Sequence, residues 1–441
     1  MDERKPPRVA MTTLGCKVNQ FESAAFTAGF RDKGAVLVAF SQPADVYVIN
    51  TCAVTAKAAM QSRQMIRRAL KANPDARIVV TGCYSQVASQ EVFDLIDHPV
   101  CIVGNGCKDR LVDIALASEH CDLEMFMADI GRQKEICRLP VSDFADRTRA
   151  FLKIQDGCDR FCSYCIVPYA RGPSRSLPPD EVESQAAALI GRGYREIVLT
   201  GIHIGMYGLD LAPPHSLDGL LDRLTVAAAP VRYRISSLES AEITERLLDL
   251  IAARPAVMPH LHIPLQSGDD EILARMNRPY TAARYRQTVE RCLARLPDAA
   301  IGVDVLVGFP GETSEQFGNT CALLEELPVT YLHVFPYSRR PGTVAAEMKG
   351  QVAKGEKDAR VARLRELDGA KRAAFYRRHL GSVRPVLAEN RNNSLRLMRG
   401  FTDNYIPVHF DAPAETGNRI VMVRLDRVEG TTVFGTRVET E

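Results

Sequence analysis

Three cysteines crowd into one short loop, and this loop constrains the fold around it more than any other stretch of the chain. Residues 154–172 read IQDGCDRFCSYCIVPYARG, in which Cys158, Cys162 and Cys165 have the spacing C-x3-C-x2-C. This spacing lets one loop place three thiolates on three corners of a cubane iron–sulfur cluster, which needs four ligands in all. The next cysteine along the chain is Cys292. One iron would therefore stay open, and an open metal position usually serves chemistry rather than support.

The alternatives are a structural zinc site that lacks one ligand and a chance grouping of cysteines. A closed zinc site needs paired C-x2-C units or a histidine partner, so we favour the cluster. The loop resembles the signature of the radical S-adenosylmethionine superfamily, in which the open iron binds this cofactor and reductive cleavage releases a 5′-deoxyadenosyl radical. The resemblance implies that Tyr164, just before the last cysteine, packs near the adenine. By residue type alone, Tyr164 is equally well explained as a core aromatic.

Composition places the chain among soluble globular proteins. Its 441 residues predict about three domains, and 46% hydrophobic and 25% charged residues are ordinary values. No apolar run approaches the ~20 residues of a membrane span, and the N-terminus has no signal-peptide pattern. We therefore expect a cytoplasmic protein without a membrane partner. Its 12 cysteines then point to metal ligation rather than disulfides, and its net charge of +2 does not by itself indicate nucleic acid.

The first 120 residues alternate between short apolar strands and amphipathic helices, which predicts a doubly wound parallel α/β domain. Cys16, Cys52 and Cys83 each follow the end of an expected strand. Because the carboxyl ends of parallel strands share one edge, these cysteines are expected to meet there as a second three-thiolate site. The alternative is that each is a small apolar residue at a strand tip.

The flanking sequences TLGCKVNQFES, VINTCAVT and VTGCYSQ resemble the N-terminal domain of the methylthiotransferases. In this subfamily of radical enzymes, three such cysteines carry an auxiliary 4Fe–4S cluster. The resemblance therefore implies two 4Fe–4S clusters and S-adenosylmethionine as cofactors. Residues 121–145 are irregular, and we interpret them as a connector.

Residues 146–376 contain about six strand–helix units, which predicts a (β/α)6 partial TIM barrel of the radical type with its functional residues after the strands. The family resemblance assigns four positions after these strands to the cofactor cleft: Gly201, Glu239, Gln266 and Gly308. Each also has an ordinary explanation, since glycines make turns and loop glutamates are commonly solvated.

Two arginines follow the cluster loop in the run YARGPSRS. Arg171 and Arg175 are candidates to neutralise a cofactor carboxylate or a phosphate, because a guanidinium binds both in a fork. The alternative is solvation at the surface. The methylthiotransferases have a similar Tyr-Ala-Arg-Gly run, although Leu177 stands here where a later arginine is expected.

The C-terminal part begins with an expected basic helix over residues 349–378, which has ten basic and four acidic side chains. Such local asymmetry is typical of a surface for a phosphate backbone, and a solvated amphipathic helix is the alternative. Residues 377–441 then show five short strands, which predict a small β-barrel resembling the RNA-binding TRAM domain. Arg396, Arg399 and Phe401 are the candidate RNA-binding residues, with Tyr405 nearby, although barrel packing also explains the aromatics.

The whole chain thus resembles a tRNA methylthiotransferase with two clusters. The segments LHIPLQSGDDEILARMNRPYT and FPYSRRPGT are most similar to the branch that converts N6-threonylcarbamoyladenosine at position 37 of tRNA to its 2-methylthio derivative. The alternative substrates are N6-isopentenyladenosine in tRNA and an aspartate of a ribosomal protein. An alternative of another class is a non-catalytic iron–sulfur protein that binds RNA or senses redox state. The expected partners are the tRNA anticodon stem-loop, S-adenosylmethionine, and an electron donor and a sulfur source of unspecified identity.

Overall fold

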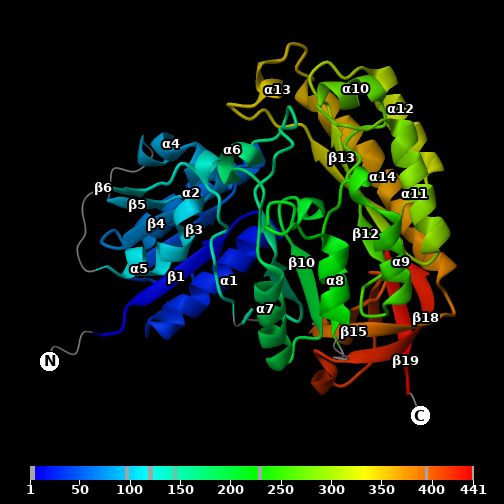
Figure 1. The fold of residues 1–441 in the computed structure, drawn as a ribbon, viewed down its shortest axis with the longest axis horizontal. Coiled ribbons are helices and arrows are strands. Elements are labelled where there is room, and N and C mark those ends of the chain that lie inside the picture. Colours follow the sequence, from blue (N-terminus) through cyan, green and yellow to red (C-terminus); the bar gives the residue numbers. More distant parts are fainter. Residues whose placement is uncertain are drawn as a thin grey trace.

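The computed structural model describes residues 5–94, 99–117, 123–141, 143–144, 147–226, 231–392 and 396–439. Three units follow one another along the chain (Figure 1). An α/β sheet domain, in blue and cyan, is followed by a larger unit of strands and helices in green to orange, and a small β-barrel in red ends the chain.

The N-terminal unit is a parallel six-stranded sheet in the order β2-β1-β3-β4-β5-β6. Its strands are β1 (Arg8–Thr13), β2 (Val36–Val38), β3 (Val46–Thr51), β4 (Arg77–Gly82), β5 (Val100–Val103) and β6 (Leu123–Phe126). Its helices are α1 (Lys17–Asp32), α2 (Ala56–Ala72), α3 (Cys83–Val87), α4 (Ser89–Asp94) and α5 (Leu111–Leu116). Strand β2 lies on one side of β1, and β3 to β6 follow on its other side, so the strand order reverses at β1 and the predicted doubly wound sheet is confirmed.

One difference concerns the expected connector over residues 121–145. Strand β6 lies inside it and pairs with β5, so the sheet continues past residue 120. An edge strand of four residues is held by backbone pairing and needs no strong side-chain periodicity, which explains why the pattern did not reveal it. Residues 121–122, 142 and 145 of this segment lie outside the described residues.

The central unit is built on six parallel strands. They are β7 (Ala150–Lys153), β10 (Glu196–Thr200), β11 (Arg232–Ile235), β12 (His260–His262), β13 (Ala300–Val307) and β14 (Tyr331–Pro336). Two three-stranded sheets, β11-β10-β7 and β12-β13-β14, are joined by parallel bridges such as that between Ser237 and His262. The strands therefore run in chain order around an open barrel, and the predicted partial TIM barrel is confirmed.

Helices cover the outside of this barrel. They are α7 (Pro179–Gly191), α8 (Leu217–Val226), α9 (Glu245–Ala253), α11 (Ala282–Arg295), α12 (Ser314–Glu326) and α14 (Lys354–Arg378). Shorter elements around the site are β8 (Gln155–Asp156), α6 (Val167–Arg171), β9 (Arg175–Ser176), η4 (Ser240–Glu242), α10 (Asp270–Arg275) and α13 (Val344–Glu347). One apolar core runs from Phe21 and Phe26 of α1 to the barrel residues Leu199 and Val303, so the two units share their packing.

Helix α14 uses many of its positive charges inside the protein. Arg360 is buried and pairs with Glu312, the Arg372 guanidinium lies 4.8 Å from the Tyr331 ring centroid, and Lys371 donates to the backbone oxygen of Leu327 at 2.6 Å. Several of the basic side chains therefore attach this helix to the barrel. This arrangement is closer to the amphipathic helix than to the phosphate-binding surface, the two interpretations made for residues 349–378.

The C-terminal unit is a closed five-stranded barrel in the order β15-β16-β17-β19-β18. Its strands are β15 (Val383–Asn392), β16 (Leu397–Thr402), β17 (Pro407–Phe410), β18 (Ile420–Glu429) and β19 (Thr432–Val438). The predicted small barrel is confirmed. Its β16–β17 turn is docked on the central unit, because Arg234 of β11 donates to the backbone oxygen of Asp403 at 3.1 Å.

Candidate active site

The Cys158–Cys165 loop lies at the carboxyl end of the central barrel, between β8 and α6. It folds back on itself: the Cys158 amide donates to Gly172 O at 3.0 Å, and the Cys165 amide donates to Cys162 O at 2.9 Å. Burial raises the pKa of Cys165 to about 12, and the neighbouring Cys162 and Cys158 thiols raise it as well. A metal that binds here must displace their protons.

An arginine from a distant segment contacts this loop. Arg278 Nη1 donates to Cys162 Sγ at 3.3 Å, and its Nη2 forms an ion pair with Glu239. The neighbouring Asn277, in the left-handed region at φ 59°, donates to the backbone oxygen of Phe161 at 3.1 Å. A buried N–H donor on a sulfur is the kind of contact that stabilises a thiolate and tunes an iron–sulfur cluster.

A histidine contacts the first cysteine of the loop. His203 Nδ1 lies 3.5 Å from Cys158 Sγ, and its Nε2 lies 2.5 Å from the Glu242 carboxylate. The Cys158 and Glu242 contacts outweigh burial and raise the pKa of His203 to about 9. Spacing along the sequence did not reveal His203 or Arg278, since their partners are 45 and 116 residues away.

The four positions expected to shape the cofactor cleft all follow barrel strands. Gly201 follows β10, and a side chain there would lie 2.8 Å from Gln155 Oε1. Gln266 has a left-handed backbone, with φ 68°. Glu239 directly precedes η4 as its N-cap and forms an ion pair with Arg278. Gly308 has φ +71°, but a side chain there would meet Lys357 at 2.2 Å, so this face of Gly308 is covered by α14. Their contacts with the cofactor stay predictions.

Tyr164 is half-buried in a small apolar cluster with Met276, Phe309 and Tyr337. Burial raises its pKa well above the ordinary value, so its hydroxyl stays protonated. The position beside the cysteine loop is compatible with both interpretations made from the sequence, a core aromatic and a partner of the adenine.

The other three cysteines meet at one edge of the N-terminal sheet. Cys16 follows β1 and caps α1, Cys52 follows β3, and Cys83 follows β4 and begins α3. Since β1, β3 and β4 are neighbours in the sheet, parallel topology brings their ends together, as expected. A side chain at Gly15 would lie 2.8 Å from Cys52 Sγ, which shows how closely the two turns approach.

Arg171 connects the two groups of cysteines. Its Nε donates to Cys83 Sγ at 3.4 Å, its Nη1 donates to Glu22 at 2.7 Å and to Asp156 at 3.0 Å, and its Nη2 donates to Asn19 at 2.6 Å. It is fully buried. All three guanidinium nitrogens have protein partners, so Arg171 joins α6 to α1. Its expected role in neutralising a cofactor carboxylate or a phosphate stays a prediction.

Arg175 is also buried, and its Nη2 donates to the backbone oxygen of Arg171 at 2.6 Å. It therefore supports the Arg171 position instead of lying at the surface. Both arginines belong to the contact between the first two units, which their position in the sequence did not indicate.

The candidate RNA-binding residues divide into two kinds. Arg399 is exposed, with its guanidinium 5.2 Å from the Phe401 ring, and Arg396 is exposed as well. Phe401 is only 9% exposed and stacks on Tyr405 with ring centroids 4.9 Å apart. Arg149 covers the same ring at 4.7 Å. Packing against the central unit thus accounts for the burial of the aromatics. Contacts of Arg396, Arg399 and Phe401 with RNA stay predictions.

Comparison with known proteins agrees with this architecture. A model of the uncharacterised protein family UPF0004 matches residues 8–104, and a model of the radical SAM superfamily matches residues 152–324. The threonylcarbamoyladenosine tRNA methylthiotransferase MtaB of Bacillus subtilis (strain 168) is 40% identical over 422 residues, which cover 95% of this chain and 93% of that protein. MtaB of Aquifex aeolicus (strain VF5) is 38% identical over 414 residues, covering 94% and 99%.

The chain belongs to this methylthiotransferase family. Among solved structures, the radical S-adenosylmethionine methyltransferase TsrM of Kitasatospora setae superposes with a TM-score of 0.56 over 77% of this chain and 75% of that chain, at 16% identity. This likeness concerns the fold alone.

Membership of the family implies S-adenosylmethionine and 4Fe–4S clusters as cofactors. The residues fit such clusters. Each group offers three thiols at one place, and in each group a buried arginine donates an N–H to one sulfur, Arg278 to Cys162 and Arg171 to Cys83.

Proposed function

We propose that this protein converts N6-threonylcarbamoyladenosine at position 37 of tRNA to its 2-methylthio derivative. The observation that supports it best is the short helix α6 (Val167–Arg171). It begins two residues after Cys165, and its last residue contacts Cys83. Five residues of α-helix rise about 8 Å, so the two groups of cysteines lie within reach of one substrate base. A radical site and a sulfur site that act on one carbon need this proximity.

The two groups of cysteines have separate roles in this proposal. When bound, the 4Fe–4S clusters supply the electron that cleaves S-adenosylmethionine at the Cys158, Cys162 and Cys165 site and the sulfur at the Cys16, Cys52 and Cys83 site. The protein itself holds the Cys158 loop in place through Arg278 and His203. It also fixes the position of one site relative to the other, because Arg171 binds Glu22 of α1 and Asp156 of β8.

The substrates are tRNA and S-adenosylmethionine, and the electron donor and the sulfur source stay unspecified. We assign the C-terminal barrel to RNA binding as a TRAM-like domain, with Arg396 and Arg399 on its exposed side. We place the activity in the cytoplasm, where tRNA is modified. Among the described residues, no helix has the length and apolar character needed to cross a lipid bilayer.

The direct test uses the purified, reconstituted protein with dithionite, S-adenosylmethionine and an anticodon stem-loop carrying N6-threonylcarbamoyladenosine. Mass spectrometry of the nucleosides should detect the 2-methylthio product together with 5′-deoxyadenosine. Loops carrying N6-isopentenyladenosine serve as the control. A protein that forms 5′-deoxyadenosine but methylthiolates only the isopentenyl loop would exclude the proposed substrate. A protein that forms no 5′-deoxyadenosine would favour the non-catalytic alternative.

A further inference from the structure

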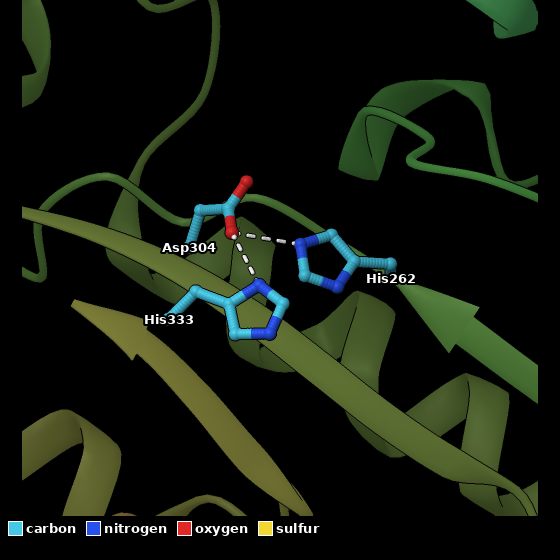
Figure 2. Close-up of side chains that lie close together, drawn as sticks. All are labelled: His262, Asp304 and His333. Carbon is cyan, nitrogen blue, oxygen red and sulfur yellow. Dashed lines mark hydrogen bonds and ion pairs between the residues drawn. The ribbon is translucent and has the colours of Figure 1, made fainter. Parts of the chain in front are cut away.

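Three polar side chains from neighbouring strands of the central barrel meet: His262 of β12, Asp304 of β13 and His333 of β14 (Figure 2). Strand register explains the meeting. His262 pairs with Gly302, two residues before Asp304, and Asp304 pairs with His333, so all three side chains lie on the same inward face. Figure 2 shows both imidazole rings directed at one carboxylate oxygen.

This group, which we call the His–Asp–His cluster, is held on one side and open on the other. Asp304 Oδ1 lies 2.8 Å from His262 Nε2 and 3.3 Å from His333 Nδ1. The other ring nitrogen of His262, Nδ1, lies 3.2 Å from the Tyr331 hydroxyl, which holds the ring in place. The His333 side chain is 49% exposed and that of Asp304 is 23% exposed. The cluster therefore offers His333 Nε2 and the second Asp304 oxygen to a ligand.

A lysine at the start of the N-terminal unit's first helix has Asp304 of the cluster among its charged neighbours. Lys17 directly follows Cys16 at the start of α1, and both residues are accessible at their surface. Burial nevertheless lowers the pKa of Lys17, with Tyr405, Arg149, Arg234 and Asp304 as the charged neighbours that act on it. Tyr405 lies next to the cluster, with its ring centroid 4.5 Å from that of His260 and 6.5 Å from that of Tyr331. We call the space between the second group of cysteines, Tyr405 and the His–Asp–His cluster the recess.

Lys17 differs from the other cations around this recess. Arg149 pairs with Glu389 at 3.0 Å, and Arg234 pairs with Glu196 at 2.7 Å. Within the described chain, the Lys17 ammonium has no ion-pair or hydrogen-bond partner. A positive charge held in a recess without a partner is expected to attract an anion. The same surplus of positive charge opposes a divalent cation at the His–Asp–His cluster, although its donor set resembles a metal site.

The proposed substrate carries a group with matching chemistry, and this inference rests on the proposed function. The threonylcarbamoyl group on N6 has a carboxylate, a secondary hydroxyl and urea N–H groups. An isopentenyl group has none of these and would leave the lysine and the cluster unpaired.

We propose that the recess is the subsite for the threonylcarbamoyl group, in which Lys17 binds the carboxylate and the His–Asp–His cluster binds the hydroxyl through His333. Because Lys17 follows Cys16, this contact would also hold the base beside the second group of cysteines. Lys17 is thus a specificity-determining residue that selects the anionic substrate over an apolar one.

The test compares anticodon stem-loops that differ by one group. One loop carries the natural threonylcarbamoyl group, a second carries the threoninamide analogue without the negative charge, and a third carries 2-aminobutyrate without the hydroxyl. The wild-type protein, Lys17→Met and Lys71→Met are reconstituted, and kcat/KM for methylthiolation is measured with each loop. Lys71 is an exposed lysine near the end of α2 and serves as the matched control.

We expect the wild-type protein and Lys71→Met to prefer the acid over the amide by about 10- to 100-fold, the range of a charge-assisted contact. Lys17→Met should lose most of this preference because its kcat/KM for the acid falls. His333→Phe should lose the preference for threonine over 2-aminobutyrate and keep the preference for acid over amide.

Several results would overturn the inference. If the wild-type protein has the same kcat/KM for the amide loop as for the acid loop, the negative charge is not recognised, and the results with the variants cannot restore the inference. A Lys17→Met protein that keeps the full preference for the acid excludes this lysine. Iron and sulfide are measured in every variant. If Lys17→Met does not retain its clusters, the inference is tested by the acid-to-amide preference of the wild-type protein and by the threonine-to-2-aminobutyrate preference of His333→Phe. Failure of the wild-type protein to methylthiolate the natural loop would instead refute the proposed function.

Discussion

Replacing Glu22 with glutamine removes one charge from a buried network and keeps the shape of the side chain. Glu22 of α1 is fully buried and pairs with Arg171 at 2.7 Å, with Lys153 at 3.7 Å and with Lys108. Asp156 is the other acidic member, 3.0 Å from Arg171. Without Glu22, three buried cations would share one carboxylate, which is a costly arrangement.

The pKa of Glu22 gives the size of the effect. Burial alone would raise this pKa, but Arg171, Lys108 and Lys153 outweigh burial and lower it from 4.5 to about 2. This difference corresponds to about 3 kcal/mol of stabilisation, which agrees with the roughly 3–5 kcal/mol lost when one partner of a buried ion pair is removed. Because the pKa is lower in the folded state, the stabilisation is complete above pH 4.5 and is lost as the pH falls toward 2.

The assay is urea unfolding of the cluster-free, reduced protein at neutral pH and at several lower pH values, followed by circular dichroism. Glu22→Gln should lower the free energy of unfolding by about 3 kcal/mol at neutral pH, and the difference from wild type should shrink below pH 4.5. Glu181→Gln breaks an exposed pair with Arg138 and should cost at most about 1 kcal/mol. A Glu22→Gln loss no larger than that of Glu181→Gln would refute the argument that this network joins the two units.

Three further predictions concern the sites themselves. Cys52→Ala should still form 5′-deoxyadenosine but lose methylthiolation, with its iron content reduced by about half; loss of both activities in a folded variant would contradict separate roles. Arg278→Met should slow S-adenosylmethionine cleavage by about 10- to 100-fold because Cys162 loses its N–H donor, and an unchanged rate would exclude this role. Gly82→Ala should cost more than about 4 kcal/mol in urea unfolding, since its methyl would lie 2.3 Å from a backbone oxygen of the neighbouring strand. Gly34→Ala, with open space, should cost only about 1–2 kcal/mol, and equal costs would count against the packing argument.

Features that depend on local spacing and periodicity could be predicted from the sequence alone. The Cys158 loop is one of them, because its three thiols lie within eight residues. The meeting of Cys16, Cys52 and Cys83 could also be predicted, because in a parallel sheet alternating strands and helices bring every strand end to one edge. The six barrel strands and the terminal β-barrel followed in the same way from their apolar patterns.

Only the tertiary structure decided which side chains from distant segments meet. Arg171 donates to Asn19 at a separation of 152 residues, and this contact between α6 and α1 could not be read from the spacing of residues along the chain. Phe401 is covered because the terminal barrel docks on Arg149. Asp304 becomes a charged neighbour of Lys17 because the sheet and the barrel share one core. Periodicity encodes which face of an element is buried, whereas the partner on the other side of that face is set by the packing of whole units.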